Sequence, residues 1–205
     1  MSWKIGISYA ILVLIMGRGT EEREEQKMKI KDLLAKGEPT LSFEVFPPKT
    51  EDKLESVEAA ALEIAGLHPA FMSVTYGAGG GTSRYTVDIA SSIMNHGVTP
   101  LAHLTCVSST KEKVHGVLEE LKDRGIENIL ALRGDIPADG KVEKDYQYAS
   151  QLIAEIKAAG DFCIGAACYP EGHVESVNKT ADIQHLKEKA VSYTHLRAHE
   201  TLSDL

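Results

Sequence analysis

Residues 98–135 read VTPLAHLTCVSSTKEKVHGVLEELKDRGIENILALRGD and contain one complete strand–helix–strand unit. Apolar runs predict a strand over 98–105 and a second strand over 127–132. The segment between them predicts a helix over 110–124, for which Thr110 is a favourable N-cap residue. A crossover helix between two apolar strands indicates that the strands run parallel.

The same pattern repeats on both sides of this unit. We expect a short helix after Met28 and then five strands that alternate with five longer helices. The strands are expected over 40–46, 70–75, 98–105, 127–132 and 162–168, and the helices over 51–66, 84–96, 110–124, 145–160 and 176–190. Such alternation predicts an α/β fold in which helices cover a parallel sheet.

Polar residues fall at or near the carboxyl ends of these strands. They are Glu44, Thr75, His103, Arg133 and Tyr169, which are 31, 28, 30 and 36 residues apart. One polar side chain per βα unit is typical of the (β/α)8 TIM barrel, whose active site lies in the loops that follow the strands. A Rossmann-type sheet instead concentrates its sequence motif in the first βα turn. We therefore expect a TIM barrel, truncated to about five parallel strands and their helices.

Charge and cysteine content exclude several classes of protein. The chain has 205 residues, with 22 Lys and Arg against 30 Asp and Glu, for a formal net charge of −8. A chain this acidic lacks the basic surface that nucleic acids select, so we expect no nucleic-acid partner. The three cysteines form no CxxC pair, which favours a reducing compartment and a cytoplasmic location.

Two local patterns invite ligand-binding interpretations. The glycine-rich segment 77–81, GAGGG, departs from GxGxxG, but its backbone could approach an anion or a flat ring; a flexible turn is an equally open interpretation. His195 and His199 would share one face of a helix, as metal ligands do. They do not form an HExxH motif and no third ligand is near, so we expect a polar tail and no metal.

Glu44 is the strongest catalytic candidate from the residues alone. It is a carboxylate between Phe43 and Val45, inside an otherwise apolar strand. Apolar surroundings favour the protonated form of a carboxyl group, as a general acid working near neutral pH requires. The alternative is a strand residue that faces solvent at the rim of the barrel.

The two ends of the chain differ from the middle. Residues 5–16, IGISYAILVLIM, are too short to span a bilayer, so we expect no membrane partner. They could be the core of a signal peptide, part of a wrongly extended start, or a genuine tail. We expect an extra, possibly non-native segment at 1–27, a partial barrel domain at 28–190 and an unrelated, possibly artefactual tail at 191–205.

Five strings in the middle of the chain together resemble one known family. They are FEVFPPKT (43–50), SVTYGAGGGT (73–82), AHLTC (102–106), LALRGDIP (130–137) and AACYPEGH (166–173). In this order and at these intervals they resemble the bacterial, flavin-dependent methylenetetrahydrofolate reductase family, over its first five βα units and about residues 28–190.

The resemblance implies a TIM barrel that binds FAD. It implies reduction of 5,10-methylenetetrahydrofolate to 5-methyltetrahydrofolate in one-carbon metabolism, with NAD(P)H or another donor reducing the flavin. Glu44 would be the acid that helps open the folate ring to an iminium, and Asp135 would contact the folate and tune the flavin. The implied flavin contacts are Thr75, Tyr76, Ala78, His103, Arg133, Gly134, Asp135, Tyr148, Ala149, Tyr169, His173, Asp182 and Lys189. Family members often form homo-oligomers, so this is expected as well.

The resemblance stops near residue 190, where the family continues with three more βα units. We therefore expect two unpaired sheet edges, which are an aggregation hazard, and no folate reduction by the isolated polypeptide. Two alternatives stay open beside the reductase. One is an inactive fragment, or a flavin-binding piece that needs a partner chain; the other is a different TIM-barrel enzyme with a carboxylate acid on its first strand.

Overall fold

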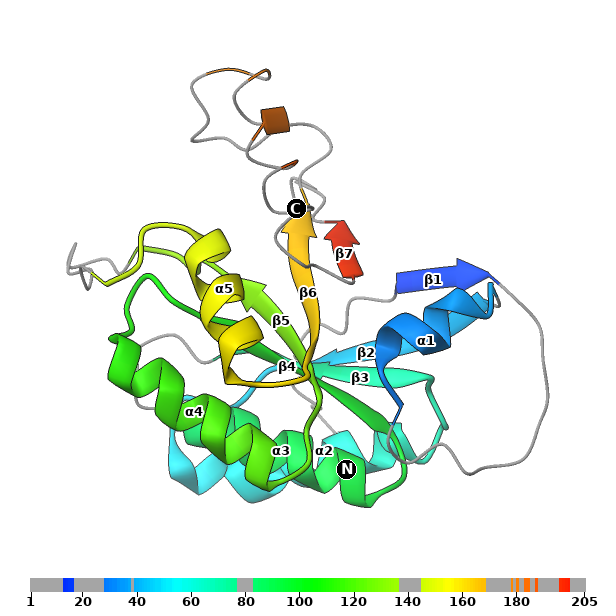
Figure 1. The fold of residues 1–205 in the computed structure, drawn as a ribbon. Helices are drawn as coiled ribbons and strands as arrows, with labels where there is room; N and C mark the ends of the chain where they lie inside the picture. The colour runs from blue at the N-terminus through cyan, green and yellow to red at the C-terminus, as the bar shows by residue number, and fades with distance from the viewer. Residues whose placement is uncertain are drawn as a thin grey trace.

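The computed structural model describes residues 13–16, 28–37, 39–76, 83–136, 145–168 and 196–199, together with positions 178, 180, 183, 184 and 187. Strands and helices alternate through this part of the chain (Figure 1). In chain order they are β1 (Val13–Met16), α1 (Ile30–Ala35), β2 (Pro39–Val45), the 3-10 turn η1 (Glu51–Lys53), α2 (Leu54–Ala65), β3 (Phe71–Val74), α3 (Ser83–Asn95), β4 (Thr99–Thr105), α4 (Lys111–Asp123), β5 (Asn128–Leu132), α5 (Ala149–Ala159), β6 (Cys163–Cys168) and β7 (Leu196–His199). No helix in this part of the chain is long and apolar enough to cross a membrane.

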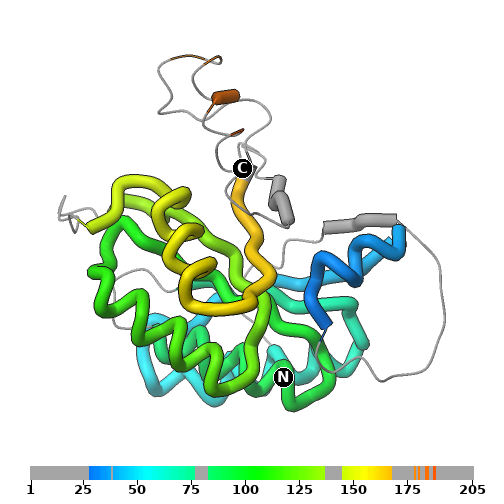
Figure 2. The backbone as a smooth tube through the Cα atoms, in the orientation of Figure 1, coloured from blue at the N-terminus to red at the C-terminus, as the bar shows by residue number. Residues whose placement is uncertain are grey.

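The strands form one sheet in the order in which they occur in the chain. From β2 to β6 every neighbouring pair is parallel. The chain returns after β2, β3, β4 and β5 through α2, α3, α4 and α5, which lie on one side of the sheet, whereas α1 lies on the other side (Figure 2). A consecutive parallel order without reversal is that of a (β/α)8 barrel rather than a doubly wound sheet. The structure thus confirms the expected fold class, a barrel truncated to five parallel βα strands.

The two faces of the sheet have separate apolar clusters. Met72, Val74 and Leu104 belong to the large core that packs against the outer helices. Residues one position away in the same strands face the other way, because side chains alternate along a strand. Leu101 and Leu130 on this second face form a smaller cluster with residues of α1. We call this second face the interior face, since it corresponds to the inside of the barrel.

Asn128 fixes α1 against the amino-terminal end of the sheet. Its Oδ1 accepts a hydrogen bond from the Ile30 backbone N–H at 2.8 Å, and its Nδ2 donates to the Met28 and Pro100 carbonyl oxygens, each at 3.3 Å. Asn128 is only 2% exposed, so these bonds satisfy a buried amide that would otherwise be destabilising. Helix α1 is therefore fixed at the end of the strands opposite to the predicted active site.

The expectation that the strands over 40–46 and 162–168 form the two unpaired edges is wrong, because β1 and β7 lie outside them and are the outermost strands of the sheet. β1 pairs with β2 in antiparallel register, and β7 pairs with β6 in parallel register. Both added strands satisfy backbone N–H and C=O groups that an open edge would expose. His199 lies in β7, so the helical arrangement of His195 and His199 is also wrong; His195 lies outside the described residues.

Helix α5 starts later than the sequence predicts. A helix was expected from residue 145, but α5 begins at Ala149. The Gln151 side chain accepts hydrogen bonds from the Gln147 and Tyr148 backbone N–H groups at 2.7 and 3.0 Å, which caps the amino-terminal end of the helix at this point. Of the helix expected at 176–190, the structure describes five positions: 180, 183, 184 and 187 are helical, and 178 is not.

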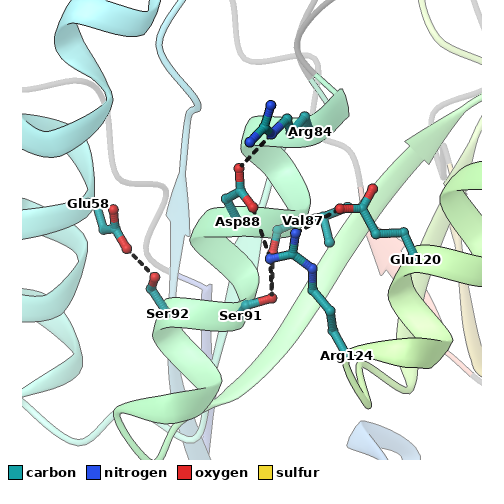
Figure 3. A network of polar contacts seen from close by, with 8 residues as sticks. All are labelled: Glu58, Arg84, Val87, Asp88, Ser91, Ser92, Glu120 and Arg124. Carbon is teal, nitrogen blue, oxygen red and sulfur yellow. Dashed lines mark hydrogen bonds and ion pairs between the residues drawn. The ribbon is translucent and has the colours of Figure 1, made fainter.

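A polar network joins α2, α3 and α4 on the outer side of the sheet (Figure 3). Arg124 lies 2.9 Å from Asp88 and 2.8 Å from Glu120, and it also donates to Ser91. Ser92 on α3 donates a hydrogen bond to Glu58 on α2. Because these groups are partly exposed, each contact stabilises the fold only slightly.

Candidate active site

Glu44 projects from β2 onto the interior face of the sheet. Its neighbours Phe43 and Val45 pack with the large core on the helical side, so the alternation of the strand turns Glu44 the other way. It is the penultimate residue of β2, and its side chain is 21% exposed. The carboxylate therefore lies near the carboxyl end of the parallel strands, where barrel enzymes place their chemistry.

Two side chains from the next two strands approach the same oxygen of Glu44. Ser73 on β3 is the register partner of Glu44, and its hydroxyl donates a hydrogen bond to Oε2 at 3.1 Å. His103 on β4 brings its Nε2 to 3.4 Å from this oxygen. The structure therefore brings together two of the predicted site residues, Glu44 and His103, and adds Ser73 to them.

The imidazole of His103 is buried and neutral. It is 8% exposed, and burial lowers its pKa from 6.5 to about 4. Its contact with Glu44 is therefore not an ion pair at neutral pH, and the 3.4 Å approach lacks hydrogen-bond geometry. Within the described part of the chain, Nε2 has no hydrogen-bond partner. A buried polar atom without a protein partner, at the edge of the sheet where the active site is expected, can form a hydrogen bond with a bound ligand.

The Arg133–Gly134–Asp135 turn follows β5 at the same edge of the sheet. The Arg133 carbonyl oxygen accepts from the backbone N–H groups of Cys106 and Val107 at 3.2 and 2.8 Å, and the Cys106 thiol lies 3.8 Å away. Gly134 has a φ of 82°, and a Cβ built on it would lie 2.9 Å from Thr105 Cβ. A glycine is therefore required here both by the backbone conformation and by the approach of β4. Asp135 is exposed beyond this turn.

Thr75 and Tyr76 follow β3 and lie at this edge as well. The Thr75 backbone N–H donates to the Val45 carbonyl at 2.9 Å, and the Thr75 carbonyl accepts from the Thr86 hydroxyl at 2.9 Å. These bonds fix the path of the chain just before the glycine-rich segment. Tyr76 is partly buried, and burial raises the pKa of its phenol.

Tyr148 and Ala149 mark the amino-terminal end of α5, which connects β5 to β6. Tyr148 is 57% exposed, whereas Ala149 is 5% exposed. The exposed aromatic ring of Tyr148 is available to a ligand, whereas the side chain of Ala149 is buried and packs inside the protein. Five predicted flavin contacts lie outside the described residues: Ala78, Tyr169, His173, Asp182 and Lys189.

Sequence reasoning missed Ser73 and Thr105. Each is a small polar residue in an apolar strand, which by itself indicates only packing. The signal that could have found Ser73 is its position opposite Glu44 once the two strands are aligned in parallel. No group of three or more His, Cys, Asp or Glu side chains is placed to hold a metal among the residues that the structure describes.

Comparisons with known proteins agree with these motifs. The family model described as methylenetetrahydrofolate reductase matches residues 29–192. The 5,10-methylenetetrahydrofolate reductase of Pectobacterium carotovorum subsp. carotovorum is 37% identical over 169 residues, which are 82% of this chain and 55% of that protein. The Escherichia coli K12 enzyme of the same name is 37% identical over 155 residues, covering 75% of this chain and 51% of the enzyme.

Two further matches are more distant in length or in sequence. Methylenetetrahydrofolate reductase 2 of Schizosaccharomyces pombe is 42% identical over 161 residues, which cover 73% of this chain and 25% of that protein. A solved structure of 2,3-dimethylmalate lyase superposes with a TM-score of 0.49 at 12% identity, covering 76% of this chain and 57% of the lyase. The chain spans about half the length of the bacterial relatives it matches. Because the family model covers most of the sequence, the chain belongs to the methylenetetrahydrofolate reductase family.

Proposed function

We propose that this chain serves the reduction of 5,10-methylenetetrahydrofolate to 5-methyltetrahydrofolate, with Glu44 as the proton donor. The observation that carries the proposal is the Glu44 carboxyl group on the interior face, bounded by the Ser73 hydroxyl and a neutral His103. The reaction adds one hydride and one proton to the substrate. A carboxyl group at the carboxyl end of the strands is a suitable source of that proton.

Glu44 would donate its proton to one of the two nitrogens that hold the bridging carbon of the folate. Proton transfer from its carboxyl group to the departing ring nitrogen breaks one carbon–nitrogen bond and leaves a cationic iminium on the other nitrogen. Asp135 would stabilise that positive charge, because a fixed carboxylate favours a developing cation nearby. The iminium carbon then accepts the hydride and becomes the methyl group.

A bound flavin would supply the hydride, and NAD(P)H or another donor would reduce it. The described residues fit a flat, polar cofactor, since His103 has a buried ring nitrogen without a partner and Tyr148 exposes an aromatic ring at the same edge. We propose FAD as this cofactor. Its proposed contacts are Thr75, Tyr76, Ala78, His103, Arg133, Gly134, Asp135, Tyr148, Ala149, Tyr169, His173, Asp182 and Lys189.

The barrel domain is proposed to occupy residues 28–190. The match of the family model to residues 29–192 supports these limits, and so does the hydrogen bond from Asn128 to the Met28 carbonyl. A cytoplasmic location, in which reduced cysteines and soluble folate coexist, and a homo-oligomeric assembly complete the proposal.

A second function is favoured by the length of the chain. The matched part, about half the length of the bacterial relatives, would bind flavin, and turnover would require further βα units or a partner. Flavin binding without folate reduction is the expected result in that case.

One pair of variants tests both functions. Flavin absorbance and reduction of methylenetetrahydrofolate are measured for the full chain, for Glu44→Gln and for Glu58→Gln, a control on the outer helices. If the chain is the reductase, Glu44→Gln should lower folate reduction by about 100-fold or more, while Glu58→Gln and flavin binding stay near the parent values. Failure of the chain to bind flavin would contradict both functions.

A further inference from the structure

We propose that Ser73 is a positioning residue for Glu44, and that its hydroxyl sets how readily Glu44 releases its proton. The inference rests on the proposed function only for the acid role of Glu44. The hydroxyl would act through the carboxyl group, without touching the reacting atoms.

The register of the sheet creates this contact. Glu44 and Ser73 are Cα partners in the parallel pairing of β2 and β3, and both side chains face the interior. Ser73 is 8% exposed, so its hydroxyl is withdrawn from bulk solvent, while the Glu44 side chain still reaches the surface. A short side chain on a central strand has little freedom to leave its partner, so the 3.1 Å bond also orients the carboxylate.

Ser73 and His103 both approach Oε2 of Glu44, but their chemistry gives them different roles. The Ser73 hydroxyl donates a hydrogen bond to this oxygen, which stabilises the carboxylate more than the protonated carboxyl group. The His103 ring approaches the same oxygen at 3.4 Å but carries no charge at neutral pH. Ser73 therefore opposes the tendency of a half-buried site to retain the proton, and this keeps the acid able to give it away.

The outer surface of the same protein offers a matched control. Ser92 on α3 donates to Glu58 on α2, so it repeats the serine–glutamate hydrogen bond on the opposite face of the sheet. Removing the Ser92 hydroxyl has the same direct chemical effect as removing that of Ser73. It leaves Glu44 untouched.

The test is a carbon-13 NMR titration of the full chain, labelled at the glutamate side-chain carboxyl carbon, without flavin or folate. Glu44→Gln identifies the Glu44 resonance by its loss. Ser73→Ala should move the midpoint of this titration upward by about one pH unit, a tenfold fall in the acid dissociation constant. Ser73→Thr, which keeps the hydroxyl, should restore a midpoint close to that of the parent, and Ser92→Ala should not change it.

The inference is overturned if Ser73→Ala moves the Glu44 midpoint no further than Ser92→Ala does. Should Ser73→Ala fail to fold, Ser73→Cys replaces it, because a thiol is a weaker donor and should still raise the midpoint. The titration needs no turnover, so an inactive chain with the expected shift would contradict the proposed function alone. An active chain without the shift would contradict this inference alone.

Discussion

Acidification should destabilise the fold through His103, because the folded chain holds this imidazole buried and uncharged. Its pKa falls from 6.5 to about 4 on burial. Between these values the unfolded chain binds more protons than the folded chain does. The contribution of His103 to stability is therefore complete above pH 6.5 and is lost as the pH falls toward 4.

The size of this effect follows from the difference between the two pKa values. At about 1.4 kcal/mol for each pKa unit, the full loss amounts to roughly 3 kcal/mol. Linkage places about 2 kcal/mol of this loss between pH 7 and pH 5, where the unfolded imidazole becomes protonated and the folded one stays neutral. Such a change is a sizeable share of the stability of a small domain.

Urea unfolding at pH 7 and pH 5 measures the loss. The parent chain should lose about 2 kcal/mol more between the two pH values than His103→Gln does, because the variant has no imidazole to protonate at this site. His96→Gln, at the exposed end of α3, should keep the pH dependence of the parent. Equal losses for the parent and His103→Gln would refute the reasoning, as would an NMR titration of the His103 ring with a midpoint near 6.5.

Three further changes test other parts of the structure. Gly134→Ala should lower the free energy of unfolding by about 2 kcal/mol or more, because the added Cβ would meet Thr105. Gly97 has a similar φ but no atom near the position of an added Cβ, so Gly97→Ala should lower it by only about 1 kcal/mol. Urea unfolding of both variants isolates the effect of the steric contact. Asn128→Ala should cost about 3 kcal/mol and speed hydrogen exchange at the start of α1, and unchanged exchange there would contradict its clamping role. Cys106 is fully buried and burial raises its pKa to about 11, so mass spectrometry should find it alkylated only after unfolding.

The strands and most helices follow from the sequence because apolar periodicity is a local property. The strand expected over 98–105 is observed as Thr99–Thr105, and the helix expected over 110–124 as Lys111–Asp123, with the Thr110 hydroxyl accepting from the Lys113 backbone. The pairing of β1 and β7 with the sheet edges could not be predicted in this way. It depends on which segments reach a row of backbone groups, and such contacts leave no side-chain pattern.

In the candidate site, too, single residues could be predicted from the sequence but the contacts between strands could not. Glu44 and His103 could be selected because a charged or ionisable residue in an apolar strand is conspicuous. Their contact could not be predicted, because β3 lies between their strands and the approach depends on the stagger of three strands. The role of Ser73 could not be predicted, because a serine among apolar strand residues indicates only packing until its register partner, Glu44, is known.

The burial of His103 has a chemical consequence as well as a cost in stability at low pH. A protonated imidazole 3.4 Å from the Glu44 carboxyl group would favour the carboxylate strongly, and an acid held in that form has no proton to donate. Because burial keeps His103 uncharged well below neutral pH, the ring places no positive charge beside the oxygen of Glu44 that accepts the hydrogen bond from Ser73. A neutral hydroxyl stabilises a carboxylate less than a full positive charge does, so the Ser73 contact opposes protonation of Glu44 less than a protonated His103 would. The proposed acid role of Glu44 therefore requires that its histidine neighbour remain neutral.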